Sequence, residues 1–246
     1  MKKLIIGSVA LSMATLVPAA AQAGDISVST SIDYASEYVF RGVSFQRGSV
    51  QPGIEISKGD FTLGAWSAVG LGETSFAAID EFDVYGSYGF GLSDLISGSV
   101  GFTLYHFPDT TGGLFDFGGA STFEVNAGLA LDTVLSPSVT AYYDFDLEAF
   151  TLEGGLSHSL PVADKTSLDL SVTGAFVTAD TFTDYEYGLA SAALSYAVSD
   201  NVSAYIGGNY SISSEDSLQF KVDGNGNGFT DSDNLFWYGA GVSTSF

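Results

Sequence analysis

The chain has 246 residues, enough for one domain, and carries 29 Asp and Glu but only 7 Lys and Arg, for a formal net charge of −22. Such acidity excludes a basic patch that would bind nucleic acid or anionic lipid headgroups. The absence of cysteine excludes disulfides and thiolate metal sites.

The N-terminal segment has the features of an export signal. Two lysines precede an apolar run at 4–17, and the small residues Ala21 and Ala23 suit a cleavage site. A retained anchor helix is the weaker alternative, because the run is shorter than the roughly 20 residues that span a bilayer. We therefore predict a signal peptide at 1–23 and one mature domain at 24–246.

Apolar and polar side chains alternate along most of the mature chain. Near the C-terminus, Phe236, Tyr238 and Val242 share one face opposite Gly239 and Ser243. A period of two residues predicts β-strands with one apolar face. Twelve such segments are expected, at 26–43, 49–57, 60–71, 80–92, 94–107, 121–131, 138–147, 149–161, 165–177, 184–198, 201–213 and 234–246.

The expected connections alternate between short turns and longer loops. The turns have the sequences SKGD, LSD, TVLSP, VADK and SDN. The other connections are expected at 44–48, 72–79, 108–120, 178–183 and 214–233, with a tight hairpin near Leu147 and Glu148. An even number of strands joined in this way is typical of a transmembrane antiparallel up-and-down β-barrel of the Gram-negative outer membrane. We therefore predict an all-β barrel of about twelve strands, with both termini periplasmic and lipid and lipopolysaccharide around it.

A secreted soluble β-sandwich would also show alternation. Aromatic residues cluster near the strand ends, as in interfacial girdles, and the opposite parity is rich in Gly and Ser. The chain also ends on Phe246, which resembles the C-terminal signature that the outer-membrane barrel assembly machinery recognises. These features favour the barrel.

Two segments depart from simple alternation. In 184–198 the apolar parity changes, which predicts a β-bulge near Ala190. Trp66 falls on the inward parity of its strand, although the reverse assignment stays open.

Placing the apolar parity in lipid puts eleven acids and one base, Arg41, on the inner wall. A carboxylate-lined pore attracts cations, so we predict a cation-favouring channel for small hydrophilic solutes. The alternative is a closed barrel, obstructed by inward Tyr and Trp side chains, with a structural, adhesive or assembly role through its loops. The eleven acids are Asp33, Glu37, Glu55, Glu81, Asp83, Glu124, Asp144, Asp146, Glu148, Glu153 and Asp169.

The segment SEYVFRGVSFQRGSV, residues 36–50, holds two of the few arginines. Glu37 and Arg41 lie four residues apart and share a strand face. If 44–48 closes a hairpin, Arg41 can bridge Glu37 and Glu55 across the first two strands. The same parity places Tyr38 and Phe40 in lipid and leaves Arg47 solvated or bound to lipopolysaccharide.

The beginning of this segment, SEYVFRGVS, resembles the N-terminal signature of the TorF-like porins, a proteobacterial family of unknown function. Further motifs of the resemblance follow in order and cover mainly the first half of the chain. The resemblance implies an outer-membrane barrel with proposed porin activity, and it carries over neither a substrate nor pore-lining residues. The further motifs are LGAWSA with Gly64 and Trp66, EFDVYGSYGF with Glu81, Asp83, Tyr85 and Tyr88, and LYHFPD with Tyr105 and Pro108.

The segment VDGNGNGFTDSDN is the best candidate for a ligand site. Asp223, Asn225, Asn227 and Asp231 take positions 1, 3, 5 and 9 of an EF-hand-like calcium loop. Position 12 is Asn234 instead of the bidentate Glu, and no helix is expected beside the loop. Calcium binding and an ordinary acidic loop therefore both stay open, and we expect no required cofactor.

Catalysis has little support in the sequence. The two histidines, His106 and His158, share the apolar parity of their strands, and neither has a complete set of partners for barrel-phospholipase chemistry. We predict no catalytic residue. The physiological solute and the oligomeric state are open at this stage.

Overall fold

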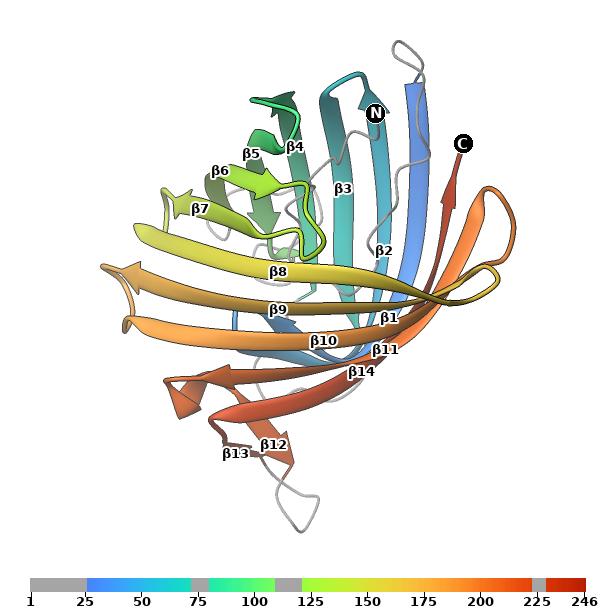
Figure 1. The fold of residues 1–246 in the computed structure, drawn as a ribbon. Coiled ribbons are helices and arrows are strands. Elements are labelled where there is room, and N and C mark those ends of the chain that lie inside the picture. The colour runs from blue at the N-terminus through green and yellow to red at the C-terminus, as the bar shows by residue number, and fades with distance from the viewer. Residues whose placement is uncertain (1–25, 72–79, 109–120, 223–228) are drawn as a thin grey trace.

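The computed structural model describes residues 26–71, 80–108, 121–222 and 229–246. Twelve long strands form a closed barrel in which each strand pairs with its neighbours along the chain (Figure 1). They are β1 Ile26–Phe40, β2 Val43–Lys58, β3 Phe61–Gly70, β4 Glu81–Gly91, β5 Ile96–His106, β6 Ser121–Leu131, β7 Ser138–Asp144, β8 Ala149–Ala163, β9 Thr166–Ala179, β10 Tyr185–Ala197, β11 Val202–Ser213 and β14 Asn234–Ser245.

Closure joins the first strand to the last. β1 and β14 pair antiparallel from Ser29 with Ser245 to Ala35 with Gly239. At the end of this ladder, the backbone N–H groups of Val28 and Phe246 each donate to the other's carbonyl, at 3.0 and 2.9 Å. The predicted all-β antiparallel barrel of twelve strands is thus confirmed, and the sandwich alternative is wrong.

The apolar parity forms the outer face of the barrel. Ile32 is 56% exposed, Leu63 55% and Phe236 62%, whereas Asp33, next to Ile32 in β1, is buried. Aliphatic and aromatic side chains lie outside and polar side chains lie inside, which is the reverse of the arrangement in a soluble protein. No helix in the described part of the chain is long and apolar enough to cross a bilayer.

The connections alternate between two ends of the barrel. We call one the short-turn end, where the connections are 59–60, 92–95, 132–137, 164–165 and 198–201. The other, the loop end, has the connections 41–42, 71–80, 107–120, 145–148, 180–184 and 214–233. The last of these contains the short helix η1 Asp216–Leu218 and a hairpin of β12 Phe220–Val222 and β13 Phe229–Asp231, beside β11 and β14 (Figure 1).

The predicted loop at 44–48 was wrong. Residues 44–48 belong to β2, and the β1–β2 connection is the two-residue turn Arg41-Gly42. Both of its residues have positive φ, 49° and 78°, as the tight turns that match strand twist require. Farther along, β7 ends at Asp144, earlier than the predicted 147, and the turn at 145–148 confirms the tight hairpin predicted near Leu147 and Glu148.

The predicted bulge near Ala190 was also wrong, since the pairing of β10 with both neighbours runs without a register shift. Its apparent change of parity has another cause. Tyr185 and Tyr187 are buried on the inner face, whereas Leu194 and Tyr196 are exposed on the outer face. One parity therefore holds throughout β10. Register shifts occur instead at Tyr38/Val39 and at Pro161/Ala163.

Candidate functional site

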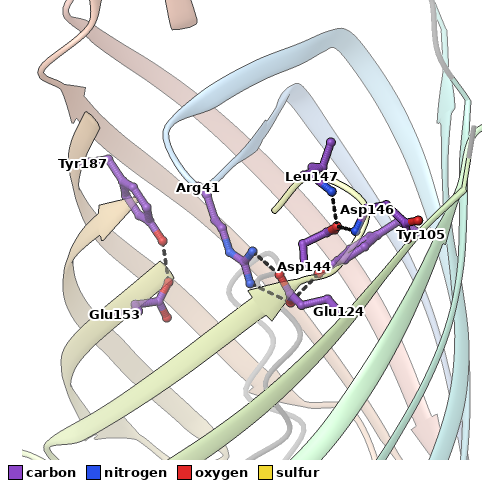
Figure 2. A network of polar contacts seen from close by, with 8 residues as sticks. All are labelled: Arg41, Tyr105, Glu124, Asp144, Asp146, Leu147, Glu153 and Tyr187. Carbon is purple, nitrogen blue, oxygen red and sulfur yellow. Dashed lines mark hydrogen bonds and ion pairs between the residues drawn. The ribbon is translucent and has the colours of Figure 1, made fainter. Parts of the chain in front are cut away.

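Hydrogen bonds between strands that are not neighbours show which side chains reach across the interior. The Tyr38 hydroxyl on β1 donates to Glu81 Oε2 on β4 at 2.9 Å. Similarly, the Tyr187 hydroxyl on β10 donates to Glu153 Oε2 on β8 at 2.5 Å, past the intervening β9 (Figure 2). Because neither pair lies on adjacent strands, both contacts pass through the inside of the barrel.

Most of the acids expected on the inner wall lie there. Asp33, Glu81, Asp83 and Glu124 are between 2% and 4% exposed. Three further acids, Glu55, Glu153 and Asp169, share the inner parity but are only half-buried. The Tyr85 hydroxyl donates to Glu55 at 3.3 Å, and the hydroxyls of Ser159 and Ser167 donate to Asp169 at 2.5 and 3.2 Å.

The remaining acids of that set have local roles. Asp144 is buried, and its Oδ1 accepts the backbone N–H groups of Asp146 and Leu147 at 2.9 and 2.8 Å, which stabilises the β7–β8 turn. Asp146 and Glu148 lie in that turn and are exposed, so the structure does not place them on the inner wall.

The β1–β2 hairpin carries the central feature of the interior. We call its residues 38–45 the tip. Arg41 extends from the turn to β6, where Nη1 donates to Glu124 Oε2 at 2.6 Å and Nη2 donates to Oε1 at 2.9 Å (Figure 2). The two side chains are 10% and 3% exposed. A buried, bidentate pair of this kind fixes both the position and the orientation of the guanidinium.

Aromatic rings and a tyrosine hydroxyl complete the surroundings of this ion pair. The Arg41 Cζ lies 4.1 Å from the ring centroid of Tyr142 on β7 and 4.7 Å from that of Phe40. On β5, the Tyr105 hydroxyl donates to Glu124 Oε1 at 3.1 Å. Cation–π attraction adds to the ion pair, and more so where the ring and the cation are desolvated.

The rest of the tip packs against other parts of the interior wall. Val43 packs on Val177, Tyr185 and Tyr187, a cluster contributed by β9 and β10. At Gly42, an added Cβ would lie 2.6 Å from the Tyr187 Cβ, so only glycine permits this approach.

The connection between β11 and β14 also holds the tip. Gln219 Nε2 donates to the carbonyl of Gly42 and to the Ser211 hydroxyl, both at 3.0 Å. The tip is therefore docked against β5–β7, β9, β10 and this connection, and it narrows the interior at the loop end.

The docking of the tip corrects what the sequence predicts for Arg41, Tyr38 and Phe40. Arg41 does not bridge Glu37 and Glu55, because the turn lies at 41–42 and directs Arg41 to Glu124. Glu37 instead pairs with Arg47, at 3.1 Å, within the β1–β2 ladder.

The two aromatic residues of this segment were placed on the wrong face. Tyr38 is 3% exposed inside the barrel, and Phe40 packs against the same cluster as Tyr38 and Trp66. The buried positions change parity between Ala35 and Tyr38, before the register shift at Tyr38/Val39, so the parity on which the lipid placement depended does not hold there. Trp66, at 4% exposed, does lie on the inward parity.

Sequence reasoning missed two residues that hold the tip, Tyr187 and Gln219. Tyr187 belongs to an apolar run of its segment, and such a run predicts the outer face, whereas Gln219 lies in a connection without a periodic pattern. One signal was available for the turn itself. Gly42 after Arg41 fits the second position of a two-residue hairpin turn.

Other predicted sites lie partly or wholly outside the described residues. Asp223, Asn225 and Asn227 of the calcium loop and the signal peptide at 1–23 are not described, while Asp231 lies in β13. Across the described part of the chain, His, Asp and Glu form no group of three that could hold a metal ion. Phe246 is exposed next to β1.

Solved structures of low sequence identity share the fold. A KdgM porin aligns with a TM-score of 0.56 and 12% identity over 89% of this chain and 99% of its own. A NanC porin gives 0.54 and 13% identity over 88% and 98%. An outer-membrane channel from Pseudomonas putida gives 0.52 and 9% over 92% and 96%. At these identities the likeness shows the fold alone.

A comparison with curated proteins found no match. The profile of one family matches residues 19–214, which is well over half of the chain, and that family is described as bacterial proteins of unknown function. The resemblance to TorF-like porins agrees with this description, although their name is not part of the match. The chain belongs to the Gcw_chp family of bacterial proteins of unknown function.

Proposed function

We propose that the protein is an outer-membrane channel for small hydrophilic solutes and that it favours cations. The observation that carries the proposal is the charge of the inner wall. Seven acids of the wall, four of them buried and three half-buried, lie inside a closed barrel whose outer face is apolar. A low-dielectric wall focuses the field of such carboxylates and attracts cations into the interior.

We infer that the interior is wider toward the short-turn end than beside the tip. Toward the short-turn end, Ser159 is exposed and Asp169 half-exposed although both lie on the inner parity. Ser203 and Ser243 share a hydrogen bond of 2.7 Å on the same side of neighbouring strands. Small hydroxyl side chains leave room for water there, whereas the tip narrows the loop end. The proposed path is thus a vestibule that leads to a constriction beside Arg41.

Orientation and export follow from the same proposal. In outer-membrane barrels the short turns face the periplasm, so the short-turn end and both termini are placed there. An export signal at 1–23 and an assembly signal at Phe246 fit this route. Lipid and lipopolysaccharide then contact the outer face. No catalytic residue and no required cofactor belong to the proposal.

The solute is proposed from this chain and not taken from a neighbour. One KdgM porin structure contains disordered oligogalacturonate. Galacturonate units carry carboxylates, which the acidic inner wall of this chain would repel. We therefore favour neutral or cationic solutes of small size.

Single-channel recording of the purified protein in planar bilayers tests the proposal. We expect discrete conductance steps and a reversal potential in a KCl gradient that reports cation preference. Asp169→Asn and Glu153→Gln should each reduce this preference, because they remove charge from the wall. Asp146→Asn is the matched control, since Asp146 lies in an exposed turn. Anion preference, or equal effects of all three variants, would contradict the acidic wall.

A closed barrel with a structural, adhesive or assembly role is the second candidate. The docked tip favours it, because the tip fills part of the interior at the loop end. A folded protein that never conducts at any voltage supports this candidate and excludes the channel.

A further inference from the structure

Groups from other strands surround the Arg41 guanidinium. Glu124 supplies both carboxylate oxygens, Tyr142 lies under the guanidinium carbon at 4.1 Å, and Tyr105 donates a hydrogen bond to Glu124. These residues belong to β5, β6 and β7, whose ladders form the barrel wall. Their backbone positions therefore do not depend on the tip.

The arrangement fits a guanidinium better than an ammonium. Two parallel N–H···O bonds, at 2.6 and 2.9 Å, require a planar group with a fixed fork of donors. The ring of Tyr142 faces the delocalised charge, as stacking on a planar cation requires. An ammonium is a compact point charge and could form only part of this geometry.

Arg41 is an imperfect occupant of these groups. Its Nε is buried and has no hydrogen-bond partner in the described structure, which leaves one donor unsatisfied at a cost in free energy. Its φ of 49° lies in the left-handed region, which is unfavourable for a residue other than glycine. A guanidinium on a free solute would not bear the backbone cost.

We propose that the wall formed by Glu124, Tyr142 and Tyr105 is a binding site for small solutes that carry a guanidinium group, and that Arg41 is its tethered occupant. A solute of this class competes with Arg41 from the interior, and its binding undocks the tip. The inference deepens the proposed function and rests on it only for the route by which solutes reach the site.

The test uses the full mature chain folded in lipid vesicles, with Arg41→Asn as the variant that empties the site. Asn tolerates positive φ, so the turn is kept while the guanidinium is removed. The probe is ethylguanidinium chloride at about 20 mM, with ethylammonium and sodium chloride at equal ionic strength as controls. We expect ethylguanidinium alone to raise the thermal midpoint of Arg41→Asn by about 2–4 °C.

Two further proteins make the result specific to the site. The double variant Arg41→Asn/Glu124→Gln should show no preference for ethylguanidinium, because the carboxylate is gone. The wild type should respond only at a concentration about tenfold higher or more, because a tethered group competes at a millimolar or higher effective concentration. Equal midpoints with ethylguanidinium and ethylammonium in Arg41→Asn, or an undiminished preference in the double variant, would overturn the proposal.

Bilayer recording separates this inference from the proposed function. We expect ethylguanidinium, unlike ethylammonium, to reduce the conductance of Arg41→Asn at least twofold at about 20 mM, with a half-maximal effect in the millimolar range for so small a ligand. Selective stabilisation of a protein that does not conduct supports the site and excludes the channel. Conductance without selective stabilisation or block leaves the channel standing and excludes the guanidinium site.

Discussion

Replacing Arg41 and Glu124 by Gln, singly and together, tests the docking of the tip most directly. The two side chains are 10% and 3% exposed, so each single change leaves the other charge buried without its partner. Removing one member of a buried pair costs about 3–5 kcal/mol. In the double variant both charges are absent, and the loss should fall below the sum of the single losses by at least about 1.5 kcal/mol.

Urea unfolding in lipid vesicles measures these free energies. Trp66 packs on Tyr38 of the tip, whereas Trp237 lies on β14. Tryptophan fluorescence in a Trp237→Phe background therefore reports undocking of the tip, and in a Trp66→Phe background it reports unfolding of the barrel. Arg47→Gln is the control for removing an arginine. The Arg47 side chain is 43% exposed, and such surface pairs contribute between about 0 and 1 kcal/mol. A coupling below about 0.5 kcal/mol between Arg41 and Glu124 would refute the docked ion pair.

Two further substitutions address the tip, and calcium titration addresses the untested loop. Gly42→Ala should destabilise the docked tip by at least about 1–2 kcal/mol, because it adds a strained φ and a clash with Tyr187. We expect the single-channel conductance to increase with it. An unchanged conductance would argue against a constriction at the tip. Tyr38→Phe leaves the buried Glu81 without its donor and should cost about 1–3 kcal/mol in urea unfolding, whereas a neutral effect would mean that water replaces the hydroxyl. Calcium binding at 223–231 stays a prediction, for which calorimetry should detect heat with Ca²⁺ but not Mg²⁺, and no heat with either ion would exclude the site.

The barrel could be predicted from sequence because its signal is local. A strand in such a barrel has one apolar face, and alternation such as Ile32 next to Asp33 records this within a few residues. Turn residues between the segments then give the strand count and the two kinds of connection. The same parity predicts the inward position of Asp33, Glu81 and Glu124. It does not predict which residues meet across the interior.

The docked tip could not be predicted in this way. Arg41 and Glu124 are separated by 83 positions, and their pairing depends on the inward bend of one hairpin after a register shift. Parity also fails where an aromatic residue faces inward. Tyrosine also occurs at outer girdle positions, so the residue type alone does not show that Tyr38 and Tyr187 face inward. Their hydroxyl partners, Glu81 and Glu153, distinguish them from girdle residues.

The position of the tip in the chain has a consequence for folding kinetics. The β1–β2 hairpin is complete after residue 58, but its partners lie on β6, β10 and the connection to β14. The contact between Gly42 and Gln219 spans 177 positions, and such distant contacts form late and slowly. We therefore expect the tip to dock only after most of the wall has formed, so that a nascent barrel has a wider interior than the finished one.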